Sequence, residues 1–232
     1  MYSTKRQSVL ILLISLSLGF SCMIYEFALA QTLSLILGHS ALRYPIAIGI
    51  YTAALGFGSL FFEKLFPSVE SNVLRLVKIE LVISIVACLS FVFLFLINSL
   101  FVSGWMSMGE IYEKTILTSL THGLVFVIGV LSGAELPILM QMSEENRLLS
   151  SAKVLSADYF GTLIAAVIFP LILLPNIHLF SIVIIATVVN LASAFLLIKV
   201  FGKENLISKN KLKLFLWSTL SILLLFSLEW NY

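Results

Sequence analysis

The sequence predicts an all-α protein, a polytopic membrane bundle of about seven transmembrane helices that form a single domain over residues 1–232. Apolar residues make up 60% of the chain and charged residues only 11%. The mean hydropathy is +1.09, and seven apolar runs follow one another with short polar breaks between them. A soluble domain has too little polar surface to cover such a composition, whereas about 20 apolar residues suffice to cross a hydrocarbon core of about 30 Å. The lipid bilayer is therefore the expected solvent.

The predicted helices follow the apolar runs in chain order. They cover residues 9–37, 44–66, 79–97, 115–142, 154–175, 177–198 and 212–228. The first run is longer than the apolar core of a cleavable signal peptide, so we expect a retained first helix. The seventh run is the shortest, and whether it spans fully is open. Pro137 removes a backbone donor from the fourth helix, which we expect to open locally there.

Basic residues predict the orientation of the bundle. Of the 14 lysines and arginines, only Arg43 and Lys114 fall in the breaks on one side, and the other twelve fall on the opposite side or at the N-terminus. Short loops rich in Lys and Arg stay in the cytoplasm. The sequence therefore predicts a multi-pass protein of a bacterial inner membrane with a cytoplasmic N-terminus.

Several classes of function are disfavoured by composition and motifs. A net charge of +2 is too small to indicate a nucleic-acid partner. Cys22 and Cys88 lie in apolar runs without a Cys or His at ligand spacing, so no metal site is expected. We find no nucleophile with a neighbouring base and no cofactor motif, so the sequence predicts neither catalytic residues nor a cofactor.

Three acids are expected to lie inside the hydrocarbon core, where an ionised carboxylate is costly unless it is paired, hydrated or buried in protein. They are Glu26, Glu135 and Asp158, and none has a Lys or Arg within the membrane as a partner. Tyr25 and Tyr159 stand next to two of them and could offer hydroxyl groups. Two interpretations stay open at this point: protonated carboxyls that hold helices together, or a path for a cation or polyamine.

Small residues at helical spacing predict where helices meet, because close backbone approach favours association in lipid. The predicted packing positions are Gly49, Gly56, Gly133 and Gly161. A faint likeness between the first and fourth helices predicts a 3+3 inverted repeat followed by one helix, and chance explains that likeness equally well.

At these residues the sequence resembles the membrane domain of the membrane-bound spermidine synthase family, in which a major-facilitator-like domain is fused to a polyamine aminopropyltransferase. The resemblance covers residues 19–198 and implies a polyamine-related role. A glycine-rich loop after a strand, which the family uses to bind decarboxylated S-adenosylmethionine, is not found. We therefore expect that this chain is not an enzyme by itself, and that a soluble aminopropyltransferase could be a separate partner. The matching phrases are Tyr25-Glu26, residues 37–40, 49–59, 133–137 and 158–161, and Phe169-Pro170.

Two functions remain as hypotheses. In the first, the three acids with Tyr25 and Tyr159 form a site that binds or passes a polyamine or another organic cation. In the second, the chain is an accessory or anchoring subunit with a structural role, held to a membrane-protein partner by its small-residue faces.

Overall fold

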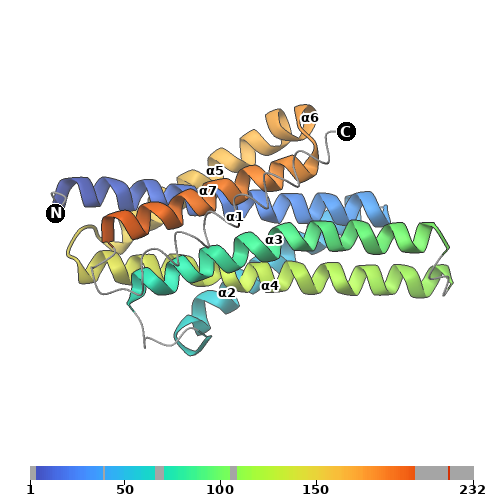
Figure 1. Cartoon of the computed structure of the whole chain (residues 1–232), viewed down its shortest axis with the longest axis horizontal. Helices are drawn as coiled ribbons and strands as arrows, with labels where there is room; N and C mark the ends of the chain where they lie inside the picture. The colour runs from blue at the N-terminus through green and yellow to red at the C-terminus, as the bar shows by residue number, and fades with distance from the viewer. Residues whose placement is uncertain (1–3, 39, 66–70, 105–108, 202–218, 220–232) are drawn as a thin grey trace.

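The computed structural model describes residues 4–38, 40–65, 71–104, 109–201 and 219. These residues are helical and contain no strand (Figure 1). Six segments are long and apolar enough to cross a membrane, which agrees with the predicted all-α membrane fold. The predicted helix over residues 212–228 lies outside the described residues, apart from residue 219. The elements are α1 (Thr4–Leu37), α2 (Ser40–Leu65), α3 (Asn72–Val102), α4 (Glu110–Glu145), α5 (Ser151–Ile168), the π-helical turn η1 (Phe169–Leu173), α6 (Leu174–Asn176) and α7 (Leu179–Phe201).

The helices are longer than the apolar runs that predicted them. The third helix was expected to begin at residue 79, but α3 begins at Asn72 and contains Arg75, Lys78 and Glu80. Charged side chains such as Lys, Arg and Glu favour helix, so an α-helix continues past the apolar stretch that defines a crossing. As a result, Glu80 lies two turns inside α3 instead of beside a loop.

Prolines act differently from the prediction. α4 stays helical through Pro137, so the expected opening near Glu135 is wrong; packing against neighbouring helices allows a proline within a membrane helix. The break occurs instead at Pro170, in the segment that was predicted as one helix over residues 154–175. There the N–H of Leu174 donates to the carbonyl oxygen of Phe169, five residues back, which makes the π-helical turn η1.

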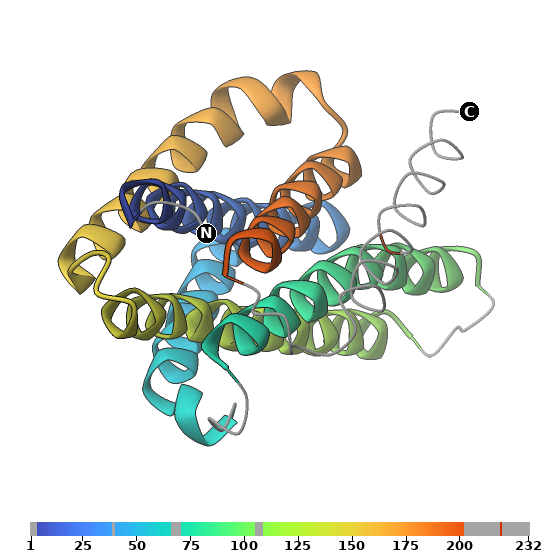
Figure 2. The ribbon, with the colours of Figure 1, turned by 60° about the vertical axis from the view of Figure 1, so that its left-hand side comes forward.

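Consecutive spanning helices run in alternate directions, so the start of α1 shares one end of the bundle with the end of α7 (Figure 1). The most extensive packing joins α1 to α5 and α2 to α4. Further contacts join α1 to α7, α3 to α4, α3 to α7 and α1 to α4. Figure 2 shows α5 above α1 and α4 below it, and α1 also packs against α7. α1 and α4 thus form the centre of the fold.

Glycines permit the closest approaches between helix backbones. A Cβ added at Gly161 of α5 would collide with the carbonyl oxygen of Leu16 in α1, and one at Gly133 of α4 would collide with that of Leu55 in α2. Gly58 makes the corresponding contact from α2 to Val130 of α4.

On α2, the contact with α4 is made by a different glycine from the two that the sequence predicted as packing positions. A Cβ at Gly49 or Gly56 would meet no atom within 4 Å, so these glycines do not form the contact with α4. Gly58 forms it because it lies two residues from Gly56, which on a helix turns it about 200° away.

Candidate functional site

A cluster of three acids lies inside the bundle and brings together α3, α4 and α5. Glu135 of α4 is near enough to Glu80 of α3 and Asp158 of α5 for their charges to interact. Glu80 is fully buried, with 0% of its surface exposed, and Glu135 is 3% exposed. Asp158 is half-buried. The bundle therefore concentrates carboxyl groups in its interior.

The carboxyl oxygens of this cluster lack partners. Both oxygens of Glu80 and the Oε1 atom of Glu135 are buried and accept no hydrogen bond. No ion pair with a basic side chain reaches either group among the described residues. Buried charges in proteins are normally paired, and ionisable groups inside a membrane usually mark functional positions. Within the described residues, no basic side chain thus balances these carboxyls.

Hydroxyl and thiol groups surround the acids in two short networks. The Tyr51 hydroxyl of α2 lies 3.2 Å from the carbonyl oxygen of Cys22, 3.4 Å from its Sγ atom and 3.2 Å from the Oγ atom of Ser132. On the other side, the Tyr25 hydroxyl donates to the Oγ1 atom of Thr187 at 3.2 Å. The sulfur of Cys88 lies 3.3 Å from the same Thr187 oxygen. These contacts fix the helices around the cluster.

Asp158 reaches the cluster because α1 and α5 approach closely. A Cβ at Gly19 would collide with the Asp158 carbonyl oxygen and would lie 2.9 Å from its Oδ1 atom. Thr162, one turn further along α5, donates to the Asp158 carbonyl oxygen at 3.1 Å. Glycine at this position of α1 leaves room for the aspartate side chain in the seam between the two helices.

The sequence-predicted residues are only partly brought together. Glu135 and Asp158 are neighbours, whereas Glu26 lies seven residues beyond Gly19 on α1, about 10 Å further along the helix axis. Glu26 is mostly buried. Like Glu135 and Asp158, it is near enough to Cys22 to interact with it electrostatically. Tyr25 is fully buried beside Thr187, but Tyr159 is 64% exposed. The binding roles of these five residues stay predictions.

Glu80 was missed by the sequence reasoning because it stands at the start of an apolar run, two residues after Lys78. A signal was present: Glu80, Ser84 and Cys88 recur at steps of four, so they share one face of a helix. Ser84 is buried and its hydroxyl has no partner. The buried amide oxygen of Asn190 on α7 also has none. Both observations extend the polar interior beyond the predicted residues.

The chemistry available to this interior is that of acids and weak hydrogen-bonding groups. In the part of the chain that the structure describes, no group of three or more His, Cys, Asp or Glu could hold a metal ion. Adjacent carboxyls without basic partners can take up protons or hold an organic cation, whose ammonium groups donate several hydrogen bonds. The fold and site together define an α-helical protein that has six helices long and apolar enough to cross a membrane and a buried acidic centre.

Comparison with known proteins relates the chain to polyamine aminopropyltransferases. The chain is 28% identical over 189 residues to polyamine aminopropyltransferase 2 of Aquifex aeolicus, covering 81% of this chain and 35% of the relative. It is 31% identical over 158 residues to polyamine aminopropyltransferase 2 of Ralstonia nicotianae, covering 67% and 28%. A polyamine aminopropyltransferase of Oceanobacillus iheyensis is 28% identical over 204 residues, covering 86% and 37%. The chain thus spans about a third of the length of these relatives. No family model and no solved structure matches it.

These relatives correct one expectation. The sequence led us to expect that the chain is not an enzyme, and this is wrong: relatives of 25–31% identity are named as an enzyme, polyamine aminopropyltransferase, which points to enzymatic function. The missing glycine-rich loop could not decide the question, because the chain aligns with only about a third of each relative. The expected resemblance to spermidine synthase-like proteins is confirmed at the level of these homologues.

Proposed function

We propose that these helices are the membrane region of a polyamine aminopropyltransferase and that the acidic centre binds the polyamine as a cation. Aminopropyl transfer joins an aminopropyl group to an amine nitrogen, so the enzyme must hold a molecule that carries several positive charges at neutral pH. One observation supports this most directly: three buried carboxyl oxygens of Glu80 and Glu135 have no partner. An ammonium group supplies the charge and the donors that these oxygens lack.

A movement between the two halves of the bundle is the proposed route to this buried site. One half consists of α1, α2 and α3, and the other of α4, α5 and α7. If α1 is matched with α4, α2 with α5 and α3 with α7, the contact between α1 and α5 corresponds to the contact between α4 and α2. The contact between α1 and α7 likewise corresponds to the contact between α4 and α3. This supports the 3+3 inverted repeat suggested by the sequence. Glu80 belongs to the first half, and Glu135 and Asp158 belong to the second. A small movement of one half against the other would admit a cation, as in carriers built from inverted repeats.

The test uses the native host, with substitutions at the chromosomal locus so that every associated segment or partner is present. Membranes are assayed for binding of radiolabelled spermidine and for transfer of an aminopropyl group to putrescine. Glu135→Gln and Glu80→Gln keep the side-chain size and remove the charge. The matched control is Glu63→Gln, because Glu63 is exposed and only accepts a hydrogen bond from Gln141 at 3.2 Å.

We expect both buried substitutions to weaken spermidine binding at least tenfold, because losing one desolvated charge contact costs about 2 kcal/mol or more. The control should bind as the wild type does. Absence of spermidine binding in wild-type membranes, or equal binding in all variants, would refute the proposal. A partner chain that always co-purifies at fixed stoichiometry, with no polyamine binding, would instead favour the structural role.

A further inference from the structure

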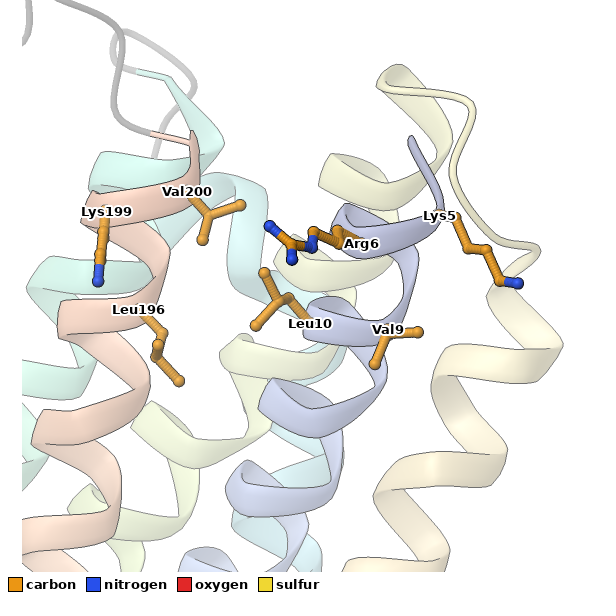
Figure 3. A pocket seen from close by; sticks show the side chains of 7 residues that line it. All are labelled: Lys5, Arg6, Val9, Leu10, Leu196, Lys199 and Val200. Carbon is orange, nitrogen blue, oxygen red and sulfur yellow. The ribbon is translucent and has the colours of Figure 1, made fainter. Parts of the chain in front are cut away.

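A second feature lies at one end of the bundle, away from the acidic centre. A pocket of about 500 Å³ opens between the first turns of α1 and the last turns of α7 (Figure 3). Arg6 points from α1 across the gap towards α7, and Leu196 and Val200 point back towards α1 (Figure 3). The lining residues are Lys5, Arg6, Val9, Leu10, Leu196, Lys199 and Val200.

The charges at the pocket have one sign. Lys5, Arg6 and Lys199 are exposed and make no hydrogen bond or ion pair among the described residues. Lys5 and Arg6 stand in the first turn of α1, which holds no acid. Cations at a helix N-terminus oppose the helix dipole and the free N–H groups there, whereas an anion is stabilised by both. The charge pattern therefore fits an anionic ligand.

The apolar side chains give the pocket depth and direction. Leu10 lies one turn below Arg6 on α1, and Leu196 lies almost one turn below Lys199 on α7. At about 1.5 Å of rise per residue, the backbone of Arg6 and Lys199 lies about 4.5–6 Å closer to the end of the bundle than that of Leu10 and Leu196. Basic residues followed by apolar residues match the order of groups in a phospholipid, in which the phosphate is followed by the first methylene groups of the acyl chains.

We propose that this pocket binds one anionic phospholipid, with its phosphate between Arg6 and Lys199 and the start of an acyl chain along Leu10 and Leu196. Arginine and lysine are the side chains that bind phosphate oxygens, and basic pockets between membrane helices recognise anionic headgroups. The volume lies within the range of about 300–1,000 Å³ that is usual for small-molecule sites. The apolar floor favours a lipid over a free phosphate, which has no apolar part to bury.

The experiment measures lipid retention by the purified full chain with native mass spectrometry. Phosphatidylglycerol and phosphatidylcholine with the same acyl chains are added separately to the detergent-solubilised protein. Arg6→Gln, Lys199→Gln and the double variant test the phosphate contacts. Lys153→Gln is the matched control, because Lys153 is an exposed lysine at the start of α5, at the same end of the bundle, and does not line the pocket. Circular dichroism verifies that each variant keeps its helix content.

We expect the wild type to retain phosphatidylglycerol preferentially, each single substitution to weaken it about fivefold and the double variant about 25-fold. Lys153→Gln should leave retention unchanged. Equal retention of the two lipids, or an equal loss in Lys153→Gln, would overturn the proposal, since either shows a general effect of surface charge. Inorganic phosphate and soluble glycerophosphoglycerol form the last arm: if either displaces the lipid at equal concentration, the ligand is a free anion and the lipid proposal fails.

Discussion

Replacing a contact glycine with alanine tests whether the helices approach as closely as the structure shows. Gly161→Ala places a methyl group against the carbonyl oxygen of Leu16, and Gly133→Ala places one against that of Leu55. In both cases the obstructing atom belongs to a helix backbone, which cannot rotate away as a flexible side chain can. The helices must therefore separate or shift along each other.

The expected cost follows from two opposing effects. Overpacking a well-packed interior typically costs about 1–3 kcal/mol, and a rigid backbone obstacle favours the upper part of that range. Alanine favours a helix over glycine by about 1 kcal/mol, which offsets part of the loss. We expect each substitution to reduce the free energy of unfolding by about 1–2 kcal/mol. The two values should be similar, because both contacts join a glycine to a backbone carbonyl in the two most extensive helix pairs.

Unfolding is measured by titrating the purified protein in mixed micelles with sodium dodecyl sulfate and following helix content by circular dichroism. The matched control is Gly123→Ala, on α4, where an added Cβ meets nothing within 4 Å. That substitution should be neutral or stabilise the protein by up to about 1 kcal/mol. If Gly161→Ala and Gly133→Ala unfold at the same detergent concentration as Gly123→Ala, the close packing derived from the structure is wrong.

Two further predictions concern the polar interior and the orientation. Tyr51→Phe keeps the ring and removes the hydroxyl that contacts Cys22 and Ser132. In the same titration, the free energy of unfolding should fall by about 1–2 kcal/mol. An unchanged value would show that these contacts contribute nothing to stability. If the N-terminus is cytoplasmic, Ser150→Cys should react with a membrane-impermeant maleimide only from the cytoplasmic side and Ser103→Cys only from the other side; the reverse pattern would contradict the orientation predicted from the basic residues.

The number and order of the first six helices could be predicted because apolar runs mark membrane crossings directly. Their ends could not, since the residues that follow an apolar run are still good helix formers. α3 shows the consequence: the prediction placed Lys78 in a loop, whereas the structure continues the helix to Asn72. The same error concealed Glu80, because an acid at the edge of a run resembles a loop residue until the helix is extended past it.

Which acids are neighbours depended on the packing between helices, and sequence spacing within one helix carries little information about that. Glu135 and Asp158 were both recognised from the cost of an acid in hydrocarbon. The proximity of Glu135 to Glu80 and to Asp158 depends on contacts between α3 and α4 and between α4 and α5. The packing of α2 shows that helix contacts, too, are hard to predict from spacing within one helix. The spacing predicted Gly49 and Gly56 as packing positions, but Gly58, two residues after Gly56, makes the contact with α4.

Close packing and the acidic centre depend on the same short segments. Gly133 lies two residues before Glu135, and Gly19 lies against Asp158. A larger side chain at Gly19 would push α5 away from α1 and displace Asp158. The bundle thus holds carboxyl groups together at a cost of several kcal/mol each unless protons or a cation compensate for it. An arrangement that served only to join helices would need no such cost, since the glycine seams and the hydroxyl contacts of Tyr25 and Tyr51 already join them. The unpartnered oxygens of Glu80 and Glu135 are therefore the observation on which the proposed cation site rests.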